Sequence, residues 1–199
     1  AALAHAPAAE ANLINYTWPL LIVLLSAPML GLRLSARHLL AVAVGLSGSL
    51  LLLARGTAFN ADAAFGYACA AGAALVWALY SVLARRLATV PSTAVAGFCA
   101  GSAALASMAH IVFEQTVAPA PGVWGAVLLL GLGPVGVAFL LWDIGMKRGD
   151  PRLLGILAYA VPVASTLMLG IAGFAALTPL LLAAALLVAA GGWLAARAG

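Results

Sequence analysis

Charged residues are scarce in this sequence of 199 residues. Lys, Arg, Asp and Glu together make up 7% of it, whereas hydrophobic residues make up 66% and the mean hydropathy is +1.17. A water-soluble domain needs more charge than this to cover its surface. The shortage therefore excludes an ordinary soluble protein and indicates an integral membrane protein.

Cysteine and clustered catalytic side chains are also scarce. The two cysteines, Cys69 and Cys99, stand in separate apolar segments at no metal-like spacing, which favours simple packing. The segment "GLGPVG" at 131–136 matches a dinucleotide-binding pattern, but it lies within an apolar run with no preceding strand. The sequence shows no Ser/His/Asp grouping. We therefore expect no enzymatic activity, no metal and no cofactor.

Long apolar runs are abundant. A helix needs roughly 20 apolar residues to cross the hydrocarbon core of a bilayer. Charged residues, Pro and Gly divide the chain into seven such predicted helices, at residues 11–31, 38–54, 63–84, 92–113, 123–146, 152–173 and 177–196. Residues 1–7 resemble the last turns of another helix. The predicted fold class is therefore an all-α integral membrane protein.

The basic residues are divided unevenly between the two ends of these helices. If successive loops alternate sides, all of the nine basic residues except Arg55 fall on one side, namely Arg33, Arg37, Arg85, Arg86, Lys147, Arg148, Arg152 and Arg197. The positive-inside rule places that side, and the C-terminus, in the cytoplasm. The net charge of +4 is thus a topology signal. We expect a bacterial inner-membrane protein embedded in lipid, with no nucleic-acid partner.

An internal repeat relates residues 7–31 to residues 151–173. Each segment opens with proline and carries Tyr-x-x-Pro in mid-helix, as Tyr16 with Pro19 and Tyr159 with Pro162. The loop charges make the two segments run in opposite directions across the membrane. Inverted repeats are typical of secondary transporters, whose substrate sites lie where the repeats meet. Chance recurrence of Tyr and Pro in apolar helices is the alternative interpretation.

The repeat predicts a larger fold. Three helices precede the second copy of the matching pair, which makes a five-helix repeat, and the first copy lacks those three. We expect a ten-helix (5+5) inverted-repeat fold, of which this chain holds the end of helix 3 through helix 10. Residues 1–54 would be the C-terminal part of the first repeat and residues 63–197 the second repeat. The missing part would span roughly 85 residues.

One helix face gathers polar residues near the first Tyr-x-x-Pro. Asn12, Asn15, Tyr16 and Pro19 follow an i, i+3, i+4, i+7 spacing, and Trp18 flanks them. Amides within a membrane need a partner, which can be another helix, water or a substrate. Trp18 is too deep in its span for the aromatic belt at the membrane surface, and this favours a cavity over packing between helices.

Two further helices present similar faces. Trp77, Tyr80 and Ser81 share one face through i, i+3 and i+4 spacing, and Tyr159 and Pro162 lie on a comparable face with Ser165 and Thr166. Core packing is the alternative for each set. Buried Tyr and Trp, however, carry a polar atom that needs a partner, so a shared aromatic-lined cavity explains all three faces together.

Asp143 is the acidic residue within a predicted span. Lys147 follows four residues later, at the cytoplasmic end of the same helix. This spacing favours a local ion pair, with a role in proton coupling as the alternative.

Three segments resemble a known family: "APAAEANLINYTWPLLIVLLSAPMLG", "AALVWALYSVLARRL" and "WDIGMKRGDPRLLGILAYAVPVAS". They are similar to the drug/metabolite transporter superfamily, EamA branch, and "NYTWP" is most similar to its YddG-type exporters of aromatic amino acids. The resemblance covers essentially the whole chain.

The resemblance implies export of aromatic and other neutral amino acids by alternating access through a central cavity. On matched positions the substrate-binding residues would be Asn15, Tyr16, Trp18, Pro19, Trp77, Tyr80, Ser81, Tyr159 and Pro162. No buried carboxylate faces the substrate ammonium, so we expect facilitated uniport. We expect the protein to be a monomer or a weak dimer. A drug or other metabolite exporter of the same fold, possibly proton-coupled, is the alternative, and a non-transporting helical scaffold is another.

Overall fold

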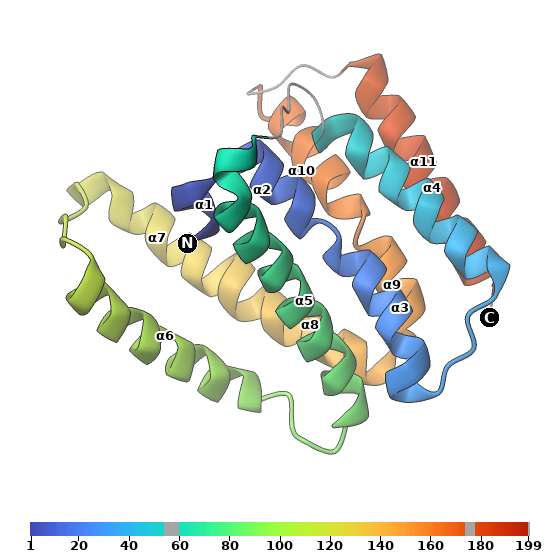
Figure 1. Cartoon of the computed structure of the whole chain (residues 1–199), viewed down its shortest axis with the longest axis horizontal. Helices are drawn as coiled ribbons and strands as arrows, with labels where there is room; N and C mark the ends of the chain where they lie inside the picture. The colour runs from blue at the N-terminus through green and yellow to red at the C-terminus, as the bar shows by residue number, and fades with distance from the viewer. Residues whose placement is uncertain (54–59, 174–177, 199) are drawn as a thin grey trace. The chain divides into compact units, whose positions relative to one another are not determined.

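The computed structural model describes residues 1–53, 60–173 and 178–198, which fold into helices with short connections (Figure 1). Arg55, predicted to lie opposite the other basic residues, falls outside the described residues. The helices are α1 (Ala2–His5), α2 (Ala8–Asn15), α3 (Trp18–Leu30), α4 (Ala36–Leu53), α5 (Ala64–Arg86), α6 (Ala94–Phe113), α7 (Trp124–Leu130), the π-helix η3 (Gly131–Val137), α8 (Ala138–Arg148), α9 (Pro151–Leu157), α10 (Ala160–Ile171) and α11 (Pro179–Ala196), with short 3-10 turns η1 (Ala61–Ala63) and η2 (Pro121–Val123).

The predicted membrane class is confirmed. Among the described residues, 6 helical segments are long and apolar enough to cross a membrane: Ala8–Leu30, Ala61–Arg86, Ala94–Phe113, Pro121–Arg148, Pro151–Ile171 and Pro179–Ala196. Helix α4 adds a shorter apolar stretch, Ala36–Leu51. These segments match the seven predicted helices, and they differ from them mainly at their ends.

The helices form two compact units. The larger unit contains Ala1–Arg86 and Gly149–Gly199, and the smaller contains Leu87–Arg148. In the smaller unit α6 packs against α8, and α7, η3 and α8 follow one another as one apolar segment. The packing units cut across the predicted division into residues 1–54 and 63–197, because helices from both parts share the larger unit. The division into repeats stays a prediction.

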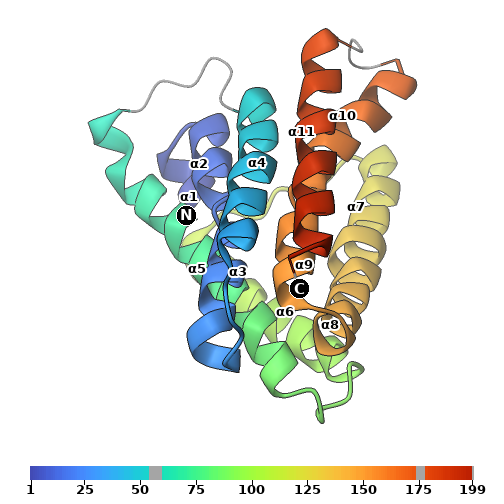
Figure 2. The same ribbon diagram turned by 90° about the vertical axis from the view of Figure 1, so that its right-hand side faces the viewer.

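Small residues bring α4 and α11 close together in the larger unit, where the two helices lie side by side (Figures 1 and 2). A Cβ on Gly191 of α11 would lie 2.9 Å from the carbonyl oxygen of Ala41 and 2.9 Å from the backbone nitrogen of Gly45. A Cβ on Gly48 of α4 would lie 2.8 Å from the carbonyl oxygen of Ala184. Membrane helices have little hydrophobic drive to associate, so such close backbone packing stabilises the pair.

We expect Gly191→Ala to destabilise the fold by about 1–3 kcal/mol, because the added methyl group meets rigid backbone rather than a flexible side chain. The matched control is Gly72→Ala in α5, where a Cβ would have nothing within 4 Å. The control should leave stability unchanged or slightly raised, since alanine is the better helix former. Thermal unfolding of both variants in detergent measures the difference, and equal midpoints would contradict this packing.

At one end of the larger unit, two arginine side chains donate hydrogen bonds to backbone carbonyls of other chain segments. Arg152 donates to the carbonyl of Arg33 at 2.8 Å, and Arg37 donates to the carbonyl of Arg197 at 3.4 Å. The sequence predicted that these four residues share one side of the membrane, and the two contacts agree with that grouping. In the smaller unit Lys147, in the last turn of α8, donates to the carbonyl of Val90 at 2.8 Å and so joins α8 to the loop after α5.

The side chain of Asp150 caps the start of α9. Asp150 accepts the backbone N–H of Arg152 at 2.8 Å, and its carboxylate also pairs with the Arg152 guanidinium at 2.7 Å. Burial alone would raise the pKa of Asp150, but the hydrogen bonds and charge of Arg152 outweigh it and hold this pKa below its ordinary value. Asp150 therefore stays ionised and caps α9.

Candidate functional site

Both Tyr-x-x-Pro segments are places where a membrane helix breaks (Figure 1). Helix α2 ends at Asn15 and α3 begins at Trp18, so the break falls at Tyr16 and Thr17. Helix α9 ends at Leu157 and α10 begins at Ala160, so the second break falls at Ala158 and Tyr159. Proline lacks an N–H and occupies an early position of each following helix, where it disturbs least. The sequence predicted continuous helices there, with the proline inside, and the structure shows interrupted ones.

The segments on either side of these breaks pack against each other. A Cβ on Gly155 of α9 would lie 3.0 Å from the carbonyl oxygen of Pro19 and 3.1 Å from Val23. Glycine thus allows α9 to approach the start of α3. Pro19 itself is fully buried. The two broken segments therefore meet inside the larger unit, as the inverted-repeat interpretation expects of a transport site.

An aromatic cluster lies next to the first break. The ring of Trp18, the first residue of α3, meets the ring of Trp77 of α5 edge to face, with 6.3 Å between centroids. Tyr80 lies one turn further along α5, 5.5 Å from Trp77 and tilted by 33°. Edge-to-face pairs are a favoured aromatic geometry. The structure thus brings together three predicted site residues from two helices.

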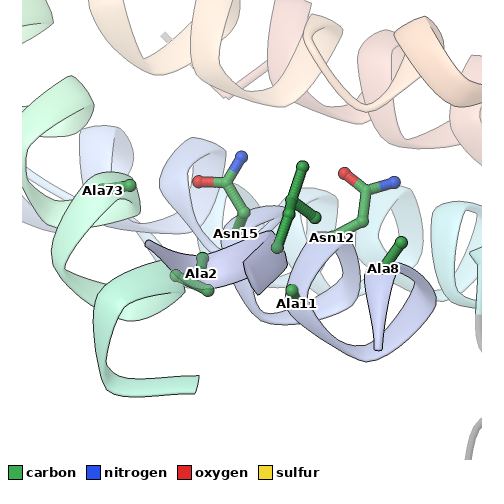
Figure 3. A pocket seen from close by; sticks show the side chains of 8 residues that line it. Ala2, Ala8, Ala11, Asn12, Asn15 and Ala73 are labelled. Atoms are coloured by element: carbon green, nitrogen blue, oxygen red, sulfur yellow. The ribbon is translucent and has the colours of Figure 1, made fainter. Parts of the chain in front are cut away.

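A pocket of about 450 Å³ opens between α1, α2 and α5 (Figure 3). Figure 3 shows the amides of Asn12 and Asn15 pointing to the same side of α2. The lining is otherwise small and apolar: Ala2, Leu3, Ala8, Ala11, Ala70 and Ala73. Ala73 lies four residues before Trp77 on the same helix, α5, so the aromatic cluster lies about one helical turn beyond the pocket along α5. The lining residues that the structure describes offer amide donors and acceptors but carry no formal charge.

Asn12 is a pocket residue that the candidate set omitted. Its place on the same helix face as Asn15 was visible in the i, i+3 spacing, and the pocket shows that both amides line the same space. The alanines of α5 carried no signal of their own, because alanine is common throughout this chain. Glu10, which precedes the predicted helix at 11–31, is a buried residue of α2.

Some predicted site residues have other contacts in this structure. Ser81 is buried, and its hydroxyl donates to the carbonyl of Trp77 at 2.8 Å. Pro162 is buried in α10, and the hydroxyl of Thr166 donates to its carbonyl at 2.8 Å. Tyr159 is a fully buried member of an apolar cluster with Val23, Val42 and Ile156. Of the nine predicted site residues, Asn15 is the one among the residues described as lining the pocket. Tyr16 is half-buried at the first break and does not line it.

Other sequence features also have defined positions in the structure. Asp143 and Lys147 form the expected ion pair, with 2.7 Å between carboxylate and ammonium. "GLGPVG" lies in the π-helix η3, a local irregularity in an apolar segment rather than a nucleotide loop. Both cysteines are free. Over the described ranges, no group of three or more His, Cys, Asp or Glu is placed to hold a metal ion.

These features define a multi-pass membrane protein with two interrupted helices meeting beside an uncharged pocket. The profile of the EamA-like transporter family matches residues 64–197. A relative from Ancylobacter novellus, named aromatic amino acid exporter YddG, is 52% identical over 193 residues, which are 96% of this chain and 67% of the relative. A solved crystal structure superposes with a TM-score of 0.93 at 51% identity, covering 98% of this chain and 70% of its own. The chain belongs to the EamA-like transporter family, as its sequence segments indicated.

Proposed function

We propose that this protein exports aromatic and other neutral amino acids across the bacterial inner membrane by alternating access. The observation that carries the proposal is the pocket itself. The amides of Asn12 and Asn15 line this pocket together with alanines, and the aromatic cluster of Trp18, Trp77 and Tyr80 lies near it along α5. The name of the relative from Ancylobacter novellus points to the same substrate class.

The chemistry of the pocket suits a zwitterion with an apolar side chain. An asparagine amide can donate to a carboxylate and accept from an ammonium group, so Asn12 and Asn15 can satisfy both ends of an amino acid. The rings of Trp18, Trp77 and Tyr80 would contact a substrate ring through stacking or edge-to-face packing. Tyr16 and Pro19, at the break, would let α2 and α3 move relative to each other. Ser81, Tyr159 and Pro162 would support the site through packing.

The proposed architecture is a ten-helix inverted-repeat fold with the arginine-rich ends and the C-terminus in the cytoplasm. The paired breaks support it, since each repeat would contribute one interrupted helix. The arginine contacts at one end of the larger unit support the orientation through the positive-inside rule.

We expect transport to be facilitated uniport, independent of a proton gradient. The described residues that line the pocket are Ala, Leu and Asn, and none of these side chains takes up or releases a proton near neutral pH. Counterflow of labelled phenylalanine in liposomes containing the full-length protein should be equal with and without a pH gradient. Unlabelled tryptophan and leucine should compete, whereas lysine and glutamate should not, because an uncharged site cannot compensate an extra buried charge.

A drug or other metabolite exporter of the same fold is the second candidate. The neutral, alanine-rich lining is compatible with an uncharged apolar compound. In that case phenylalanine would not exchange, or flux would disappear without a proton gradient. Either result would overturn the uniport proposal while leaving the family membership intact.

A further inference from the structure

A buried hydroxyl on another helix holds the second helix break. The hydroxyl of Ser49 in α4 donates to the carbonyl oxygen of Tyr159 at 3.0 Å, although the two residues are 110 positions apart in the sequence. Both residues are 0% exposed. A buried hydroxyl needs a hydrogen-bond partner, and this carbonyl supplies one. The bond therefore joins α4 to the residue at which the segment of α9 and α10 is interrupted.

Ser49 differs from other serines of these helices in its partner. A helical serine can donate to a carbonyl of the preceding turn of its own helix. Four serines of the described helices do so: Ser26 to Val23, Ser47 to Ala43, Ser81 to Trp77 and Ser107 to Ala103. The corresponding local acceptor for Ser49 is the carbonyl of Gly45, four residues earlier. The hydroxyl can therefore exchange the break for its own helix without being left unsatisfied.

The backbone at the second break is bonded in short steps. The N–H of Tyr159 donates to the carbonyl of Ile156 at 3.2 Å, and the N–H of Val161 donates to the carbonyl of Ala158 at 3.1 Å, each three residues back. Pro162 has no N–H to donate to Ala158 in the regular four-residue pattern. Three-residue bonds have poorer geometry than those of an α-helix. A donor from outside the segment therefore has more influence on the backbone here than within a regular helix.

α4 also receives the ring of Tyr159. A Cβ on Gly45 would lie 3.0 Å from the Cδ2 atom of Tyr159, so the absence of a side chain at Gly45 lets the ring lie against α4. Gly45 and Ser49 are four residues apart and share one face of the helix. This face therefore contacts Tyr159 twice, once along its ring and once at its carbonyl.

The hydroxyl at the first break has a local partner instead. Thr17 donates from its hydroxyl to the carbonyl of Ile14 at 2.8 Å, three residues earlier in the same segment. The second break is bonded to α4, and Tyr159 also belongs to the buried cluster that contains Val23 of α3. A change of angle between α9 and α10 must therefore break or exchange the bond from Ser49, and it reaches α3 through the packing of Tyr159.

We propose that Ser49 is a positioning residue of the transport cycle, which holds the second helix break through the carbonyl of Tyr159 and turns to the carbonyl of Gly45 when α9 and α10 change their angle. This inference rests on the proposed transport function. It gives Ser49 a role in the conformational change and not in contact with the substrate. A bond that is made in one state and exchanged in the other biases the equilibrium between them.

Ser49→Ala tests the bond by hydrogen/deuterium exchange of the full-length protein. The substitution removes one oxygen atom and leaves the packing of α4 in place. Amides of residues 158–163 should exchange about fivefold faster, the effect of losing one buried hydrogen bond, while amides of α11 should not change. The matched control is Ser47→Ala, since Ser47 is exposed two residues away on α4 and bonds to its own helix. It should leave exchange at the break unchanged.

The same two variants test the role in transport. In Ser49→Ala the maximal rate of phenylalanine counterflow should fall at least about threefold, because the break spends less time in its defined arrangement. The KM should change by less than about twofold, because Ser49 does not contact the substrate. Ser47→Ala should match the wild type in both quantities.

Unchanged exchange at residues 158–163 in Ser49→Ala would overturn the inference, because the bond would then not hold the break. Faster exchange with an unchanged maximal rate would also overturn it, leaving Ser49 with a structural role alone. If the wild-type protein moves no amino acid, the proposed substrate fails, while exchange at the break still tests the bond. The labelling rate of Ser165→Cys on α10, with Cys69 and Cys99 replaced by alanine, then takes the place of the transport rate. Equal labelling with and without Ser49→Ala would contradict a role in the conformational change.

Discussion

Pro19→Ala should reduce the maximal transport rate by at least tenfold while leaving Tm unchanged or higher. Pro19 is the second residue of α3, directly after the break that ends α2. Alanine restores the N–H that proline lacks, and this N–H can donate to the carbonyl of Asn15 four residues earlier. Proline inside a helix costs about 3 kcal/mol, so removing it favours one continuous helix from α2 into α3 by a comparable amount. A straight helix cannot flex where the cycle requires it.

Pro28→Ala is the matched control for this prediction. Pro28 lies within the same helix, α3, is exposed, and is not next to a break. Its replacement should leave the transport rate close to that of the wild type. If both variants transport normally, the interrupted helix is not the moving part. If Pro28→Ala alone fails, the flexible point lies near the end of α3.

Trp77→Ala should raise the KM for phenylalanine about tenfold or more and leave the KM for leucine less affected. The ring of Trp77 contacts both Trp18 and Tyr80, so it is the central member of the aromatic cluster. An aromatic contact is worth about 0.5–1.5 kcal/mol beyond the area it buries, and loss of packing adds to this. The measurement is the concentration dependence of counterflow for the two substrates.

A double-mutant cycle with Trp18→Ala separates binding from packing. If the two rings form one wall of the site, the double variant should lose little more than either single variant, because the first substitution already removes their contact. Trp193→Ala is the control: Trp193 is exposed on α11 and stacks on Arg197 at 4.1 Å. Equal losses of phenylalanine and leucine transport in Trp77→Ala, with a lowered Tm, would mean that the cluster only supports the fold.

The helices could be predicted because their signal is strong and local. Apolar runs separated by charges, Pro and Gly predicted the position of each long helical segment. The arginines near the helix ends predicted which ends lie on the same side of the membrane, and the structure joins these ends through contacts of Arg152 with Arg33 and of Arg37 with Arg197. The spacing of Asp143 and Lys147 predicted their ion pair for the same reason. Patterns of this kind depend on neighbours within one helix or loop, so a sequence alone contains them.

The helix breaks and the division of roles within the site could not be predicted in the same way. Tyr16 and Tyr159 stand at the same place in the two Tyr-x-x-Pro segments, yet Tyr16 is half-buried and Tyr159 is fully buried in the core. Gly45 lets the ring of Tyr159 lie against α4, and Gly155 lets α9 approach Pro19. Such contacts join residues far apart in the sequence. Helical spacing placed Trp77, Tyr80 and Ser81 on one face, but it could not show that the Ser81 hydroxyl bonds to its own helix.

The most direct test of the proposed site is protection of an introduced cysteine by substrate. Ala73 lines the pocket, so in a full-length protein with Cys69 and Cys99 replaced by alanine, Ala73→Cys places one thiol beside the amides. Phenylalanine should slow its reaction with a methanethiosulfonate reagent severalfold, with half-maximal protection near the transport KM. Lysine should have no effect, and Ala88→Cys, in the exposed turn after α5, should react equally in all conditions. Unprotected labelling at residue 73, while the same protein still transports phenylalanine, would show that the substrate binds elsewhere.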